Sequence, residues 1–253
     1  MKNMFTLKSI TLLLTILFTS LSISAQDATE IITKMDQKAR GESSTAEITM
    51  IIIRPSWQRS ISMKTWSRGI DYSMVLITSP ARDKGTATLK RKNEIWNWVP
   101  NIGRTIKLPP SMMMQSWMGS DFTNDDLVRE SSIVNDYSHE IVGDSTIAGF
   151  DCYKIQLIPK PEAAVVWGKI YVWVSKTEYL QLKTEFYDED DYIVNIMEGK
   201  DVKEFDGRLL PSKLEMIPVD EPGNKTVLEY KSMKFNQGIS QNFFSVQNMK
   251  RVQ

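Results

Sequence analysis

Hydrophobic residues recur with two different periods along this chain, and the change of period separates one helix from a long series of strands. Between residues 27 and 41 the apolar side chains fall at helical spacing, on one face that carries Ile31, Ile32, Met35 and Ala39. Asp27 is suited to cap the start of this helix, and Gly41 is placed to end it. The pattern therefore predicts an amphipathic helix at residues 27–41.

After Gly41 apolar and polar residues alternate, which is typical of β-strands. Short stretches with Pro, Gly, Asp or Asn separate the segments. The predicted strands are residues 45–54, 60–66, 72–78, 86–91, 95–99, 104–108, 138–142, 152–159, 169–175, 180–187, 192–197, 202–205, 209–217 and 226–235. Such short connections indicate antiparallel neighbours.

The clearest alternation lies at residues 180–186, where one face carries Leu180, Leu182 and Phe186. The other face carries Gln181, Lys183 and Glu185, so this sheet has one dry side. Many antiparallel strands with one buried face and few helices to cover it favour strong curvature. The predicted fold class is mainly β (α+β): a strongly curved antiparallel sheet or unclosed β-barrel with an N-terminal helix and a helical lid.

One segment interrupts the strands, and we call residues 109–131 the lid. Its first part is rich in flexible apolar side chains, among them Met112, Met113, Met114, Trp117, Met118 and Phe122. Methionine is unbranched and polarizable, so a methionine cluster can repack around apolar partners of varied shape. The same pattern also fits an ordinary core helix after Pro109 and Pro110. Thr123, with Asp125 and Asp126 behind it, reads as the capped start of a helix that runs to about Ser131.

The amino terminus resembles a secretory signal peptide at residues 1–25. Lys2 and Lys8 precede an apolar stretch from about residue 10 to residue 23, and the stretch ends in the small residues Ser24 and Ala25. The alternative is an uncleaved membrane anchor, for which the apolar stretch is short. We expect cleavage after Ala25, a periplasmic location, and one domain at residues 26–253, since β-sandwiches and barrels of this length are commonly undivided.

Charge and chemistry narrow the function classes. The chain has 31 basic and 31 acidic residues, and it lacks the basic patch that nucleic-acid binding needs. Cys152, the only cysteine, lies in a strand-like alternation and is expected to be a buried, inert thiol. We expect a monomer without an internal disulfide.

Catalysis has little support in the sequence. His139 is the only histidine, and no Gly-x-Ser-x-Gly motif occurs. One histidine and one cysteine cannot form a zinc site. The acidic run at residues 188–191 lacks the spacing of a calcium loop and is expected to be a solvated turn. We therefore expect no cofactor, no metal and no enzyme activity.

Residues 114–127, Met-Gln-Ser-Trp-Met-Gly-Ser-Asp-Phe-Thr-Asn-Asp-Asp-Leu, resemble the pattern of the outer-membrane lipoprotein-sorting proteins, relatives of the periplasmic carrier LolA. The leader, the opening helix and the ending at residues 242–246 agree with this resemblance. It implies an unclosed antiparallel barrel whose helices plug the hollow and swing aside for acyl chains. It also implies a carrier of lipid or lipoprotein acyl chains in lipoprotein sorting or lipid export, with an inner-membrane transporter or exporter and an outer-membrane acceptor as partners.

Candidate site residues follow from the lid and from the aromatic side chains. The six apolar lid residues from Met112 to Phe122 are candidates for contact with lipid, and Trp96, Trp98, Tyr171 and Trp173 for the lining of the hollow or its rim. Each tryptophan also fits plain core or an exposed barrel wall. Carriers of the LolA type hold the lid closed with an arginine on an early strand. Arg54, Arg59 and Arg68 all lie in the early hairpins, and no motif selects one of them.

Two other classes of function remain open at this point. One is a non-catalytic periplasmic accessory that docks on an exporter complex of the envelope, for which exposed apolar surface would serve equally well. The other, weaker class is a hydrolase acting on an envelope lipid, for which no catalytic set can be named.

Overall fold

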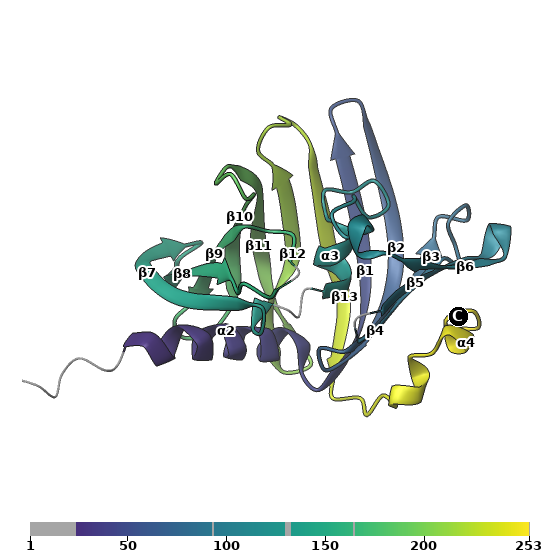
Figure 1. Cartoon of the computed structure of the whole chain (residues 1–253), viewed down its shortest axis with the longest axis horizontal. Helices are drawn as coiled ribbons and strands as arrows, with labels where there is room; N and C mark the ends of the chain where they lie inside the picture. Colours follow the sequence, from purple (N-terminus) through teal and green to yellow (C-terminus); the bar gives the residue numbers. More distant parts are fainter. Residues whose placement is uncertain (1–23, 93, 130–132, 164, 253) are drawn as a thin grey trace, which may run out of the picture.

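The protein folds around one curved antiparallel sheet (Figure 1). The computed structural model describes residues 24–92, 94–129, 133–163 and 165–252. Thirteen strands of this part of the chain form the sheet, and its two edges, β6 and β7, are not paired with each other. The predicted fold class, a mainly β chain with an unclosed curved sheet, is confirmed.

The strands follow one another as hairpins, and their bounds agree with most of the predicted ones. They are β1 (Ser43–Arg54), β2 (Trp57–Arg68), β3 (Tyr72–Ser79), β4 (Ala87–Arg91), β5 (Glu94–Val99), β6 (Arg104–Leu108), β7 (Tyr137–Ile147), β8 (Phe150–Pro159), β9 (Lys169–Ser175), β10 (Gln181–Tyr187), β11 (Ile193–Phe205), β12 (Arg208–Pro218) and β13 (Lys225–Phe235). The helical elements are α2 (Ser24–Arg40), η1 (Pro100–Ile102), η2 (Pro110–Met112), α3 (Asn124–Arg129), η4 (Gln241–Phe243) and α4 (Val246–Met249).

Two predicted strands are in fact one. Residues 192–197 and 202–205 were expected to flank a turn, whereas β11 runs without a break from Ile193 to Phe205. Asp201 has a positive φ of 52°, and the pairing with β12 skips this residue. The turn-like residues therefore produce a local irregularity within a strand and do not end it.

The order of strands places the lid across the open side of the sheet. The sheet reads β6-β5-β4-β3-β2-β1-β13-β12-β11-β10-β9-β8-β7, so β1 pairs with β13 and the chain is a meander except between β6 and β7. The connection from β6 to β7 contains the lid and must travel from one edge of the sheet to the other. In Figure 1 its helix α3 lies between the half that ends at β6 and the half that ends at β7.

The main core lies on the concave face of the sheet. On β1 the buried residues alternate as Ala46, Ile48, Met50 and Ile52, each at most 7% exposed. The helix α2 adds Ile31, Ile32 and Met35 to the same core, as predicted, whereas Ala39 stays exposed beside the cavity described below. The helix begins at Ser24, before the predicted Asp27, and the rest of the predicted signal peptide, residues 1–23, lies outside the described residues.

A smaller core covers the other face of the sheet near β3. Val75 and Ile77 belong to the main core, while Met74 and Leu76 pack against the C-terminal segment, and alternate residues of a strand point to opposite faces. Phe244 and Met249 of that segment are 1% and 0% exposed. Figure 1 places α4 beside β4 and β5, far from α2. The C-terminal segment therefore covers the convex face near β3 to β5 and leaves the concave face to α2 and the lid.

Candidate functional site

The centre of the lid is a tight loop closed by its own backbone. The amide of Trp117 donates to the carbonyl oxygen of Phe122 at 2.8 Å, and Ser116 forms an isolated bridge with Thr123. The loop turns through Met118 and Gly119, whose φ angles are 55° and 79°. The loop is therefore held in shape by its own hydrogen bonds.

The apolar side chains of the lid do not all point the same way. Met113, Trp117 and Phe122 are 6%, 5% and 3% exposed, whereas Met114 is 68% exposed. Met112 and Met118 are half-buried. Met113 and Met112 pack with Ile95 and Leu108 at the β6 edge, whereas Trp117, Phe122 and Met118 pack on the main core. The methionine cluster is thus divided between two packing sites and the surface.

One arginine ties the loop to the sheet. The Arg54 guanidinium donates to both carboxylate oxygens of Asp121, at 3.1 and 2.9 Å, and to the Gly119 carbonyl oxygen at 3.3 Å. The Thr226 hydroxyl donates to Asp121 at 2.6 Å. The side chains of Arg54 and Asp121 are only 14% and 7% exposed, so water screens this pair weakly.

The other two early arginines bind elsewhere. Arg59 pairs with Asp83 at 2.5 Å, in the hairpin between β3 and β4. Arg68 donates to the Ile239 carbonyl oxygen at 2.6 Å, in the C-terminal segment. Of the three arginines that the sequence left open, only Arg54 is hydrogen-bonded to the lid among the residues that the structure describes.

A capping box holds the start of α3. The Thr123 hydroxyl accepts from the Asp126 amide at 3.1 Å, and the Asp126 carboxylate accepts from the Thr123 amide at 2.8 Å. The indole Nε1 of Trp167 also donates to Asp126, at 3.2 Å. Burial raises the pKa of the Asp126 carboxyl, and these hydrogen bonds oppose the shift. The predicted cap at Thr123 is confirmed. The described part of α3 runs to Arg129, and its predicted end near Ser131 lies outside the described residues.

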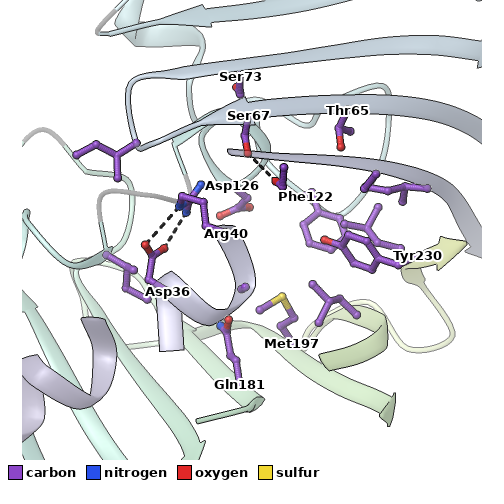
Figure 2. Close-up of a pocket in the computed structure, with 18 of the residues that line it drawn as sticks. Asp36, Arg40, Thr65, Ser67, Ser73, Phe122, Asp126, Gln181, Met197 and Tyr230 are labelled. Atoms are coloured by element: carbon purple, nitrogen blue, oxygen red, sulfur yellow. Dashed lines mark hydrogen bonds and ion pairs between the residues drawn. The ribbon is translucent and has the colours of Figure 1, made fainter. Parts of the chain in front are cut away.

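A cavity of about 270 Å³ lies between the concave face, α2 and the lid. Most of its lining is apolar, including side chains from strands in both halves of the sheet: Ala46, Ile48, Met63, Val75, Ile170, Phe186, Met197, Met216 and Leu228. Phe122 is the buried apolar residue of the lid that lines it. Figure 2 shows Phe122, Met197 and Tyr230 around the cavity.

The cavity also has a polar end next to the last turn of α2. Arg40 binds Asp36 through two hydrogen bonds, at 2.8 and 3.3 Å, and both residues line the cavity. Ser67 and Ser73 lie on the strands that face this pair (Figure 2). The site thus combines an apolar interior with one polar end.

The four aromatic candidates lie away from this lining. Trp96 and Trp98 pack in the C-terminal cluster on the convex side, where the Lys250 ammonium lies 5.3 Å from the centre of the Trp98 ring. Tyr171 and Trp173 pack with Cys152 and flank the Lys154 ammonium at 4.2 and 4.9 Å. None of the four lines the cavity described above.

Apart from Phe122, the residues that line the cavity were not singled out as site residues from the sequence. These residues occupy inward-facing positions of the predicted strands. They are ordinary Ile, Met, Val and Ala residues spread over many segments, so no single segment marks them as part of a site. Only the pairing of the strands in the folded sheet brings these residues together.

The remaining chemistry-bearing residues fit structural roles. Cys152 is fully buried, as predicted, and burial raises the pKa of its thiol. In the described part of the chain no group of three His, Cys, Asp or Glu side chains could hold a metal ion, and no helix is long and apolar enough to cross a membrane. Residues 188–191 form an exposed turn between β10 and β11, with Asp191 paired to Lys169.

His139 joins α2 to the segment that follows the lid. Its Nε2 lies 2.9 Å from the Ile133 carbonyl oxygen, which can only accept, so Nε2 carries the proton. Its Nδ1, 3.0 Å from the Thr29 hydroxyl, then accepts. Burial lowers the pKa of this imidazole below 6.5, and its hydrogen bond to Ile133 opposes the shift.

We expect an NMR titration of this single imidazole to give a pKa below 6.5 in the folded protein and near 6.5 in denaturant. A depressed pKa means that the unfolded state takes up the proton first as the pH falls. The histidine's contribution to stability is therefore present above pH 6.5 and is lost as the pH falls through the folded-state pKa. A folded-state value at or above the denatured one would contradict this assignment.

The comparison with family models assigns the chain to a family. A model described as "-like: Uncharacterized protein" matches residues 69–251, from the turn after β2 through the lid to the C-terminal segment. The chain belongs to this family. The family match thus includes the lid and every strand from β3 to β13. A comparison with curated proteins found no match.

Solved structures share the whole fold. A DUF1329 family protein from Desulfovibrio piger is 23% identical with a TM-score of 0.82, and the match covers 90% of this chain and 100% of that one. A domain described as an outer membrane lipoprotein-sorting protein, from Vibrio parahaemolyticus, is 23% identical with a TM-score of 0.79 and the same coverage. A LolA superfamily protein from Nitrosomonas europaea is 22% identical with a TM-score of 0.75, over 89% of this chain and 99% of that one. The predicted resemblance to the LolA-like fold is confirmed.

Proposed function

We propose that this protein is a periplasmic carrier that holds an acyl chain of a lipid or lipoprotein in the cavity beneath its lid. The observation that carries the proposal is the mainly apolar cavity closed by a lid whose Phe122 side chain lines it. Each methylene removed from water contributes about 0.8 kcal/mol, so a partly buried acyl chain binds without covalent chemistry.

The size of the cavity indicates how the carrier would work. Its volume of about 270 Å³ lies just below the range of roughly 300–1,000 Å³ that is usual for small-molecule sites. The closed protein would therefore admit only part of a chain. Movement of the lid, with Phe122 and Trp117, would enlarge the cavity, and binding would shift the population from closed to open.

Export and exchange complete the proposal. Residues 1–25 would direct the chain across the inner membrane, and residues 26–253 would act as one non-catalytic domain. A transporter or exporter of the inner membrane would supply the acylated cargo, and an acceptor at the outer membrane would receive it. The outward-facing Met114 and the other apolar lid residues from Met112 to Phe122 would meet the cargo as the lid moves.

The direct experiment is to purify the protein from membranes and analyse it by mass spectrometry under native conditions, then to titrate it with a fluorescent fatty acid. A carrier retains lipid and binds the probe. If the protein is lipid-free and the probe fails to bind, the role of a docking accessory on an exporter complex replaces this proposal.

A cavity-filling substitution provides a sharper test. Ala46 lies on β1 inside the cavity lining, and Ala46→Phe would occupy part of the space that the acyl chain needs. We expect the affinity for the fluorescent fatty acid to fall by about tenfold, which corresponds to roughly two lost methylene contacts. Thr49→Phe, on the same strand but on the other face, is the matched control and should bind normally. Equal binding by both variants, with intact circular dichroism, would show that the probe does not use this cavity.

A further inference from the structure

Three turns meet at one end of the sheet. They join β1 to β2, β10 to β11 and β12 to β13, and because β1 is antiparallel to β13 they all lie at the same end (Figure 1). A Cβ on Gly223 would lie 3.3 Å from Cγ of Pro55, so the turn before β13 packs against the turn before β2. The Val219 amide donates to the Val194 carbonyl oxygen at 2.9 Å, which joins the turn before β13 to β11. We call these turns the tip surface: residues 55–57, 188–192 and 219–224.

The tip surface exposes large apolar side chains. Trp57 is 50% exposed, Tyr192 71% and Val219 38%, one at each of the three turns. The Tyr192 amide donates to the Asp188 carboxylate at 2.9 Å, so the turn that presents this ring is held by its own hydrogen bond. Single exposed apolar residues are normal on a soluble protein, whereas a group with a tryptophan and a tyrosine on adjoining turns is typical of interface anchors. The tip surface therefore has the apolar composition of a docking site.

The charge of the tip surface is negative. Its three turns contain six acidic residues and no lysine or arginine. Asp191 is paired with Lys169 of β9, and Asp188 accepts from two amides of its own turn. The other four carboxylates are exposed and have no ion-pair partner within the described part of the chain: Glu189, Asp190, Asp220 and Glu221.

Three basic side chains next to the tip surface are already bonded. Arg54 is bonded to the lid, and Arg59 is paired with Asp83. Lys225, which follows the last turn, is bonded to Glu215 within the sheet. The field at the tip surface is therefore set by its own carboxylates, which attract cations and repel the anionic surface of a membrane.

We propose that the tip surface docks a partner protein whose contact surface has an apolar centre surrounded by lysine or arginine side chains. The inference rests on the proposed exchange of cargo for the existence of a partner, and it adds which surface of the carrier and which chemistry of the partner meet. Trp57, Val219 and Tyr192 would pack against the apolar centre, and the exposed carboxylates would pair with the surrounding cations. The guanidinium carbon of Arg54 lies 5.8 Å from the centre of the Trp57 ring, so the partner would dock beside the residue that ties the lid to the sheet.

The test uses a synthetic peptide as the probe. A labelled peptide of about 14 leucine and lysine residues, arranged as an amphipathic helix, represents a basic surface with an apolar centre. Its analogue with glutamate in place of lysine is the charge control. In fluorescence anisotropy we expect the lysine peptide to bind about tenfold or more tightly than the glutamate peptide, and about 0.5 M salt to remove most of this difference, because salt screens exposed charges.

Variants assign the binding to the tip surface. Trp57→Ser and Tyr192→Ser remove the two aromatic anchors, and each should weaken binding of the lysine peptide by about tenfold. Asp220→Lys together with Glu221→Lys reverses part of the charge, so this variant should lose the lysine peptide and gain affinity for the glutamate peptide. All four positions are exposed, so the sheet should remain folded in each variant.

The matched controls lie at the other end of the same strands. Leu209 of β12 is 40% exposed and lies directly opposite the exposed Glu204 of β11. Leu209→Ser and Glu204→Lys therefore make the same kinds of change on a surface outside the proposed docking site. Both variants should bind the lysine peptide as the wild type does.

The outcomes separate this inference from the function beneath it. If the lysine peptide fails to bind, or binds the tip variants and the wild type equally, the docking site is overturned while fatty-acid binding still supports the carrier. If the peptide binds at the tip surface but no fatty acid binds, the carrier proposal fails, and the same surface serves the docking accessory.

Two further measurements identify a different occupant. If the wild type self-associates in analytical ultracentrifugation and the tip variants do not, a second copy of this chain occupies the surface. If the wild type sediments with vesicles that contain phosphatidylglycerol and the tip variants do not, a membrane occupies it. Either result would overturn the assignment to a basic partner protein.

Discussion

Replacing Arg54 with methionine is expected to loosen the lid and to tighten the binding of acyl chains. The substitution leaves the Asp121 carboxylate, 7% exposed, with Thr226 and without its cation. Removing one partner of a buried pair costs about 3–5 kcal/mol, and we take the lower figure because Arg54 is 14% exposed. This cost falls on the closed state, in which the pair exists.

Ligand affinity should therefore rise as the lid loosens. When only the open form binds, the apparent dissociation constant is the intrinsic one divided by the open fraction. If the closed state loses about 3 kcal/mol of stability, the apparent dissociation constant falls by up to about 100-fold. Hydrogen exchange of residues 109–129 should accelerate in the same variant, and titration with the fluorescent fatty acid measures the affinity.

Arg59→Met is the matched control for this experiment. Arg59 also lies beside the turn of the first hairpin and also pairs with an aspartate, but Asp83 belongs to the hairpin between β3 and β4. Its loss should leave lid exchange and ligand affinity unchanged. An Arg54 variant with wild-type exchange in the lid, or with faster exchange in every strand, would contradict the assignment of Arg54 as the residue that holds the lid.

Replacing Gly199 with alanine is expected to destabilise the whole sheet. A Cβ at this position would overlap the Gln181 carbonyl oxygen and would lie 3.0 Å from Cγ of Pro211. The first contact is with backbone, which cannot move aside without disturbing the pairing of β10 with β11. Overpacking of this kind costs about 1–3 kcal/mol or more, and we expect the upper part of this range.

Thermal unfolding provides the measurement. A loss of about 3 kcal/mol lowers the melting temperature of a domain of this size by roughly 6–12 °C. Gly143→Ala is the control, because a Cβ there has no atom within 4 Å. A Gly199 variant that melts with the wild type would show that the sheet accommodates the methyl group and that β10 and β11 are less tightly paired than described.

Gly199 also shows where local sequence signals stop being informative. Gly199, Lys200 and Asp201 have the composition of a turn, and a period-two pattern breaks there. The chain continues as one strand because Gly199 pairs with Leu214 and Val202 pairs with Pro211 on β12. A pairing between residues this far apart leaves no trace in a short window of sequence.

In the lid, too, local sequence predicts some features, whereas others depend on contacts between distant residues. Composition and spacing were enough to identify residues 109–127 as a special apolar segment and to place the cap at Thr123. They could not tell that Met113 is buried and Met114 exposed, because both have the same neighbours in sequence. The choice of Arg54 over Arg59 and Arg68 depends on its contact with Asp121, 67 residues away.

The lid is covalently anchored to the sheet at both of its ends, since it joins the edge strands β6 and β7. It acts as a strap and not as a door on one hinge: it can bow outward, but neither end can detach. The 28 residues from Pro109 to Asp136 span about 90 Å when fully extended, at 3.3 Å for each residue. The length of this strap sets an upper limit on the girth of anything held behind it, so lengthening the strap would widen the range of cargo sizes without any change to the wall of strands.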